Sequence, residues 1–264
     1  MADSPGTLFR SGRLAEAVSV AGAGVRAAPS DLAARVLLAE LLLFADNIQR
    51  ADVILDAAAD IDPQAAVVVA EFRQLLRGET ARRQLRSDGR LPEFLGEPSP
   101  ALAAALAAQV ALRSGDLAAA ARHAAEVEAL RPRVPGRHNG TGFADFRDAC
   151  DLHAGFFEVL TTTGKYFWIP TERVASATFH KPERARDLFW RRVTMSVHQG
   201  PDGEVYVPAI YGSDAPDRTD ALRLGRETAW PDLGGLVRGV GQRVFLAGDD
   251  AVTVMDLGTL EFGA

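Results

Sequence analysis

Apolar residues in the first half of the chain recur at helical spacing. Leu32, Val36, Ala39 and Leu43 follow the i, i+4, i+7, i+11 pattern that places side chains on one face of a helix. Alanine, leucine, arginine and glutamate dominate the same region, and all four are strong helix formers. The pattern therefore predicts an all-helical first half, including one long helix from about Gln64 to Arg86.

Equivalent residues in this region repeat with a fixed period. Three pairs lie 34 positions apart: Leu14 and Ile48, Ala17 and Ala51, Pro29 and Pro63. A third copy follows 69 residues after the second and ends at Pro132. A 34-residue period with small residues and a closing proline is typical of tetratricopeptide repeats, although the tryptophan of that motif is absent. We therefore predict a tetratricopeptide-like array, with chance spacing among the alanines of a helical bundle as the alternative.

The second half of the chain has short runs of β-branched and aromatic residues separated by turn signals, which are typical of strands. The expected strands are Tyr166–Ile169, Ala175–Phe179, Trp190–Val197, Val205–Ala209, Val244–Ala247 and Val252–Met255. A hairpin is expected over Arg192–Pro208, with Val193, Met195 and Val197 facing Val205 and Val207. Before these strands, the apolar positions of Phe143–Leu160 predict an amphipathic helix. The expected result is a small antiparallel barrel or curled sheet with one leading helix.

The two halves meet in a stretch without apolar periodicity. Residues Arg131–Gly142 contain two prolines and three glycines, which marks a linker or long loop. The sequence therefore predicts an α+β fold with two domains. Residues 1–137 would form the tetratricopeptide-like helical domain, and residues 138–264 would form the β-rich domain.

Composition and charge argue against several classes of protein. The 264 residues carry 29 basic and 35 acidic side chains, a net charge of −6, which argues against a nucleic-acid binder. No apolar run approaches the roughly 20 residues needed to cross a bilayer, and no secretory signal is visible. Cys150 is the only cysteine, so the sequence predicts neither a disulfide nor a structural zinc site. A cytoplasmic location is the simplest interpretation.

Catalytic motifs are missing. The sequence contains no G-x-S-x-G and no H-E-x-x-H, and the segment around Lys165 lacks the first glycine of a phosphate loop. Asp145, Asp148 and Asp151 precede His153, so metal binding is one interpretation of this cluster. Arg147 lies within the cluster and no second histidine follows, which favours ion pairing or solvation. We predict no catalytic residues, no metal and no cofactor.

Two stretches are candidate protein-binding surfaces. In the second repeat copy, Ala33, Val36, Glu40 and Leu43 are expected to line the inner face of the array. That stripe suits an amphipathic helix with apolar anchors and a basic residue opposite Glu40.

The second candidate is the neighbourhood of Tyr166, Trp168, Trp190 and Arg191, residue types that are enriched at interface hot spots. Packing in the core is the alternative for both candidates.

Three blocks of the sequence are distinctive: GRLPEFLGE at Gly89–Glu97, TGKYFWIP at Thr163–Pro170 and RGVGQR at Arg238–Arg243. With the segments between them, from about Leu8 to Asp250, they resemble the ImpE family, also called TagJ or SciE-type proteins, of bacterial type VI secretion systems. The resemblance implies a helical repeat-like N-terminal domain, a distinct C-terminal domain and a non-enzymatic cytoplasmic role near the contractile sheath. It also implies a sheath subunit as partner and an influence on sheath assembly or on recycling by a AAA+ unfoldase. The alternative function is an enzyme, or a small-ligand or metal sensor, with a site between the domains around Asp145–Asp151.

Overall fold

Helices fill the first part of the computed structural model, which describes residues 3–59, 66–212 and 218–263. They are α1 (Pro5–Arg10), α2 (Leu14–Ala27), α3 (Leu32–Phe44), α4 (Ile48–Ala59), α5 (Ala66–Ser87), α6 (Pro100–Arg113) and α7 (Leu117–Leu130). Several helix starts are encoded locally, because the side chains of Ser4, Asp31, Ser99 and Asp116 each accept a hydrogen bond from the amide three residues later. The predicted long helix corresponds to α5, and the first two of its predicted residues lie outside the described part.

Strands dominate from Gly136 onward and form an eight-stranded antiparallel sheet. Its spatial order is β2 (Thr141–Phe143), β1 (Gly136–His138), β16 (Thr259–Phe262), β6 (Val174–Phe179), β7 (Trp190–Val197), β8 (Asp202–Pro208), β4 (Phe156–Thr161) and β5 (Tyr166–Pro170). The sheet has two edges, β2 and β5, and does not close. Of the two predicted forms, a barrel or a curled sheet, the structure has a sheet and not a closed barrel.

Three smaller sheets are found in the described part of the β-rich region. They are β15 (Asp250–Thr253) with β14 (Val244–Ala247) and β3 (Phe146–Asp148), β10 (Thr228–Ala229) with β13 (Val240–Gln242) and β9 (Ile210–Tyr211), and the pair β11 (Asp232–Leu233) and β12 (Leu236–Val237). Short helical turns connect the strands: η1 (Asp151–His153), η2 (Thr171–Arg173), η3 (Ala185–Leu188) and α8 (Asp220–Arg223). The predicted hairpin is confirmed, since β7 and β8 pair with Val193 opposite Val205.

The predicted leading helix over Phe143–Leu160 is wrong. This segment contains the end of β2, the strand β3, the turn η1 and most of β4. Its aromatic residues meet through the sheets instead of along one helix: the rings of Phe146 and Phe157 stack at 5.7 Å. The carboxylates of Asp145 and Asp148 accept hydrogen bonds from the amides of Phe146 and Cys150, local contacts that compete with helix formation.

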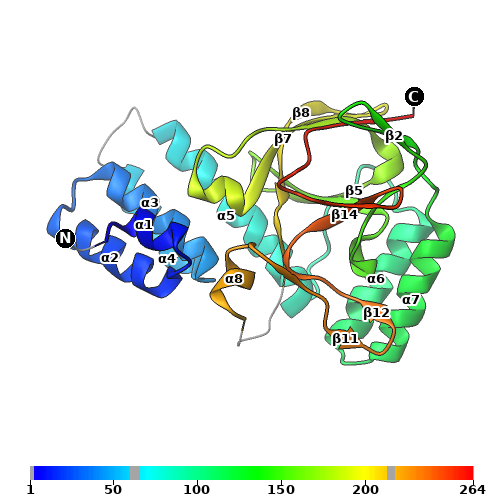
Figure 1. The fold of residues 1–264 in the computed structure, drawn as a ribbon, viewed down its shortest axis with the longest axis horizontal. Helices are drawn as coiled ribbons and strands as arrows, with labels where there is room; N and C mark the ends of the chain where they lie inside the picture. The colour runs from blue at the N-terminus through cyan, green and yellow to red at the C-terminus, as the bar shows by residue number, and fades with distance from the viewer. Residues whose placement is uncertain (1–2, 60–65, 213–217, 264) are drawn as a thin grey trace.

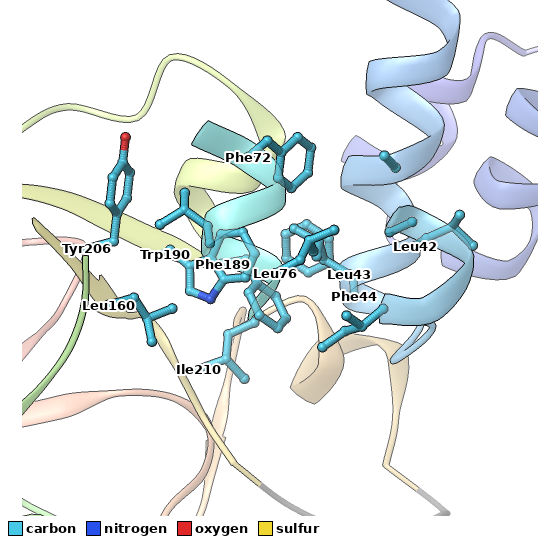
Figure 2. Close-up of a cluster of buried hydrophobic side chains, with 14 of the residues drawn as sticks. Leu42, Leu43, Phe44, Phe72, Leu76, Leu160, Phe189, Trp190, Tyr206 and Ile210 are labelled. Carbon is cyan, nitrogen blue, oxygen red and sulfur yellow. The ribbon is translucent and has the colours of Figure 1, made fainter. Parts of the chain in front are cut away.

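Helix α5 joins the two regions. In Figure 1, α1–α4 lie at one end of the molecule, the sheets and the α6–α7 pair lie at the other, and α5 runs between them. Gly78 allows the close approach of α5 to the sheet, because a Cβ at this position would lie 3.2 Å from the Cδ2 atom of Leu160. Phe44 of α3 packs against Phe189 at 5.3 Å, and Phe72 of α5 packs against Trp190 at 6.2 Å (Figure 2).

One hydrophobic cluster therefore extends from the helices into the sheet. A helical region followed by a β-rich region confirms the predicted fold class. The division into two domains at residues 137 and 138 stays a prediction. Among the described residues, no helix combines the length and apolar character that crossing a bilayer requires.

Candidate functional site

The aromatic candidate surface lies in the interior. Tyr166, Trp168, Trp190 and Arg191 are 3%, 0%, 0% and 2% exposed. Trp190 lies beside Phe189 on the sheet side of α5 in Figure 2. The guanidinium of Arg191 donates to the carbonyl of Met255 at 3.1 Å. These four residues are therefore not accessible to a partner in this structure.

The candidate binding stripe on α3 is only partly exposed, because another segment of the chain packs on it. Ala33 is exposed and Val36 is half-buried, whereas Glu40 and Leu43 are buried. The turn η3 packs against α3 and covers the second half of the stripe. Only the N-terminal half of the predicted groove is accessible from outside.

Glu40 has an unusual environment for a carboxylate. Its Oε1 atom is buried without a hydrogen-bond partner among the described residues. Burial raises the pKa of Glu40 to about 7, and the nearby Arg186 and Arg184 oppose this shift without cancelling it. The basic charge that the sequence assigned to a partner helix opposite Glu40 is thus supplied by the chain's own η3 segment.

Replacing Glu40 by glutamine should raise stability at pH 8 relative to the wild type, by on the order of 2 kcal/mol. The folded-state pKa is raised, so wild-type stability falls as the pH rises from about 4.5 to about 7. The glutamine variant lacks this loss, and the two proteins should differ much less at pH 5. Urea unfolding of both proteins at the two pH values measures the difference, and a gap that is the same at pH 5 and pH 8 would contradict it.

A buried ionic network connects α5 to the sheet. Its centre is Glu158 on β4, whose two carboxylate oxygens accept hydrogen bonds from Arg82 on α5 at 3.0 and 3.1 Å. Arg243 and the hydroxyl of Tyr166 also donate to Glu158. Burial alone would raise the pKa of Glu158, but the arginines hold it well below its usual value.

The network continues on both sides of Glu158. On one side, Glu79 contacts Arg82 at 3.4 Å and accepts a hydrogen bond from the indole of Trp190 at 3.2 Å. On the other side, Arg243 lies 3.2 Å from Asp148, which accepts a hydrogen bond from the hydroxyl of Tyr211 at 2.6 Å. These contacts fix the positions of α5, β4 and β13–β14 relative to one another.

The carboxylates of the Asp145–Asp151 cluster have separate partners. Asp145 binds Arg131 at 2.6 Å and Asp151 binds Arg147 at 2.6 Å, while Asp148 is buried in the network. Burial lowers the pKa of the adjacent His153 to about 3, so this histidine is neutral at physiological pH. Among the residues that the structure describes, no group of three or more histidine, cysteine or acidic side chains is placed to hold a metal ion.

A cavity of about 530 Å3 lies next to the network, between the end of α3, the second half of α5, residues 210–212 and the arginines Arg218 and Arg223. We call it the arginine cavity. Among the described residues, its charged lining consists of Asp46, Glu79 and five arginines, Arg82, Arg83, Arg86, Arg218 and Arg223. Two other cavities, of about 20 and 180 Å3, are smaller.

Sequence reasoning missed both the network and the cavity. A usable signal was present at two positions: Glu158 interrupts the apolar strand F-F-E-V-L, and Arg243 lies between two strand-forming segments in the RGVGQR block. A charge inside a buried strand is costly unless it is paired, so each of these residues implied a partner. The partners lie 76 and 85 residues from Glu158 along the chain, and local patterns do not connect them.

Comparison with known proteins gives concordant findings. The profile of the family described as ImpE protein matches residues 140–261. A tetratricopeptide repeat profile matches residues 8–71, which confirms the tetratricopeptide-like character of the first two predicted copies, and the third copy stays a prediction. The type VI secretion system accessory component TagJ of Pseudomonas aeruginosa is 32% identical over 255 residues, covering 97% of this chain and 89% of that protein. A Vibrio parahaemolyticus protein solved by X-ray crystallography is 25% identical, with a TM-score of 0.91 over 98% of this chain and 97% of that one.

Proposed function

Because the chain belongs to the ImpE family of type VI secretion accessory proteins, we propose that it is a non-enzymatic scaffold for the contractile sheath. It binds a sheath subunit through a helix or peptide of that subunit. It thereby modulates sheath assembly or the recycling of the sheath by a AAA+ unfoldase in the cytoplasm. The observation that carries this proposal is the match to TagJ, which extends over nearly the whole of both chains.

The helical region supports a binding role. Tetratricopeptide-like helices stack into a curved surface that commonly receives a helix or an extended peptide. Here α1–α4 project from the sheets at one end of the molecule, where a partner has access to them (Figure 1). The buried network, in contrast, lies under α5 and holds the two regions together.

The proposed contact lies on the accessible half of the α3 stripe, at Ala33 and Val36. Glu40 and Leu43 are buried where η3 packs against α3, so a partner does not contact them directly. A partner helix therefore needs an apolar side chain to pack against Val36. It needs no basic residue opposite Glu40, because Arg184 and Arg186 of the chain itself are already near that carboxylate.

The test is direct binding of the full chain to purified sheath subunits of the same secretion system, measured by isothermal titration calorimetry. A complex with one sheath subunit is expected. Absence of heat and of co-elution with every sheath subunit at tens of micromolar would overturn the proposed partner.

Two substitutions locate the contact. Ala33→Arg and Val36→Asp should weaken binding about tenfold or more, because each places a charge in the apolar contact. Val53→Asp is the matched control, since Val53 on α4 is 66% exposed and lies outside the stripe. Equal binding by all three folded variants would move the contact elsewhere while leaving the sheath partner intact.

A further inference from the structure

A short segment of the β-rich region lies on the helices. Strands β6 and β7 are neighbours in the large sheet, and residues 180–189 connect them in place of a tight turn. The middle of this connection is η3, which packs against α3 beside Glu40. We call residues 181–188 the strap. It lies where a partner helix that extended beyond Val36 along the stripe would have to bind.

The strap keeps its shape through hydrogen bonds of its own. The carboxylate of Asp187 accepts hydrogen bonds from the amides of Glu183 at 2.8 Å and Arg184 at 3.0 Å. The amide of Asp187 donates to the carbonyl of Arg184 at 3.1 Å, and next to the strap the amide of His180 donates to the carbonyl of Arg192 at 2.9 Å. Detachment of the strap from α3 breaks none of these bonds, so the segment can move as a unit.

The polar contact between the strap and α3 is poorly satisfied. Glu40 and Arg186 have opposite charges and are only 5% and 7% exposed. The Oε1 atom of Glu40 and the Nε and Nη1 atoms of Arg186 nevertheless have no hydrogen-bond partner among the described residues. Arg186 instead packs over the ring of Phe72 at 5.0 Å and donates to Glu71 on α5 at 3.4 Å. Buried polar atoms without partners are costly, so this contact holds the strap weakly.

The charge of Glu40 also opposes the closed position, in which the strap lies on α3. Burial raises the pKa of Glu40 to about 7, and Asp187 raises it further, while Arg186, Arg184 and the amide of Ala185 lower it. Because this pKa is higher in the closed position than in solvent, the closed position loses stability as the pH rises toward 7. At pH 8 the buried carboxylate is ionised and favours detachment.

Apolar side chains hold the strap in place. Ala185 and Leu188 are half-buried against the cluster that joins the helices to the sheet. Phe189, immediately after the strap, packs against Phe44 of α3 at 5.3 Å. Shortening Leu188 should therefore loosen the strap and leave the contact between the two phenylalanine rings intact.

We propose that the strap is a self-inhibiting segment, which occupies the second half of the α3 stripe in the free chain and leaves it when a partner helix binds. This inference rests on the proposed function, because it concerns the same stripe. On the closed form a partner contacts Ala33 and Val36. Once the strap has left, a longer helix also reaches Glu40 and Leu43, and a basic residue on it takes the place of Arg186.

Limited proteolysis of the full chain by trypsin at pH 8 tests detachment in the free protein. Trypsin cleaves after arginine, and the buried Arg186 becomes a substrate only when the strap leaves α3. Cleavage there, followed by mass spectrometry, should be several-fold slower in Glu40→Gln, which removes the buried charge. It should be several-fold faster in Leu188→Ala, which removes an apolar anchor. Glu204→Gln, a change at an exposed carboxylate, is the control and should be cleaved like the wild type.

Cleavage after Arg82 is the internal reference for global unfolding. This arginine of α5 is 2% exposed and donates to Glu158 at 3.0 Å. Cleavage after Arg186 should precede it in the wild type and in every variant. If the two sites were cleaved at the same rate, the strap would leave only when the whole chain unfolds, which would overturn the proposal. Equal cleavage after Arg186 in the wild type, Glu40→Gln and Leu188→Ala would overturn it as well.

The second part of the test adds a purified sheath subunit. The bound subunit should accelerate cleavage after Arg186, and its affinity, measured by isothermal titration calorimetry, should be several-fold higher for Leu188→Ala than for the wild type. Binding that leaves cleavage after Arg186 unchanged, or slows it, would overturn the role of the strap alone, and the sheath partner would stand. Absence of binding by both the wild type and Leu188→Ala would overturn the sheath partner and, with it, the role of the strap as a competitor.

Discussion

Replacing Glu158 by glutamine should lower the free energy of unfolding by about 3–5 kcal/mol. Glu158 is 2% exposed and accepts hydrogen bonds from Arg82, Arg243 and Tyr166. The neutral amide leaves two buried guanidinium groups without their shared carboxylate, and an uncompensated buried charge is costly. Urea unfolding at pH 7, followed by circular dichroism, measures the loss.

Glu204→Gln is the matched control for this experiment. Glu204 is on β8 of the same sheet and pairs with Arg192 at 3.4 Å, but both side chains are about 40% exposed. Exposed ion pairs contribute little, so this variant should lose about 0–1 kcal/mol. Similar losses in the two variants would show that the network around Glu158 does not stabilise the junction between α5 and the sheet.

Trp190→Ala should cost about 3–5 kcal/mol as well, for a different reason. The indole is fully buried and packs against the rings of Phe189 at 5.2 Å and Phe72 at 6.2 Å. Truncation opens a cavity at the point where α5, η3 and β7 meet, and the surrounding elements relax only in part. Thermal and urea unfolding should both report the change.

Trp190→Phe separates packing from hydrogen bonding at this position. Phenylalanine keeps most of the ring and loses only the indole hydrogen bond to Glu79, so a loss of about 1–3 kcal/mol is expected. If Trp190→Ala were as stable as the wild type, the indole would not be part of the core. Because Trp190 is buried, a loss of partner binding in Trp190→Ala would indicate a direct contact only if the variant is still folded.

Much of the fold was predictable because it is encoded locally. The helices follow from residue spacing and from caps such as Asp31 and Ser99, and the β7–β8 hairpin follows from alternation around a short turn. The error over Phe143–Leu160 arose because six apolar positions fit a helical period as well as a succession of short strands. Aromatic residues that find partners from distant strands decided the outcome.

The candidate sites were less predictable, because burial depends on distant contacts. Val36 and Glu40 were correctly placed on one face of a helix, but η3 covers part of that face from about 140 residues later in the chain. The arginine cavity likewise combines α5 with α8, which are joined only in three dimensions. No local spacing connects such residues.

The position of β16 in the large sheet has a consequence for synthesis of the chain. β16 pairs with β1 on one side and β6 on the other, so the β1–β2 hairpin joins the sheet only through residues Thr259–Phe262. Gly136 leaves the ribosome 126 residues before Phe262, which corresponds to roughly 6–25 s of translation at typical rates. During that interval the nascent hairpin and the exposed edge of β6 have no partner, and they are candidates for chaperone protection. The sheet becomes complete only after residues Thr259–Phe262 have been made, whereas α1–α7 can pack earlier.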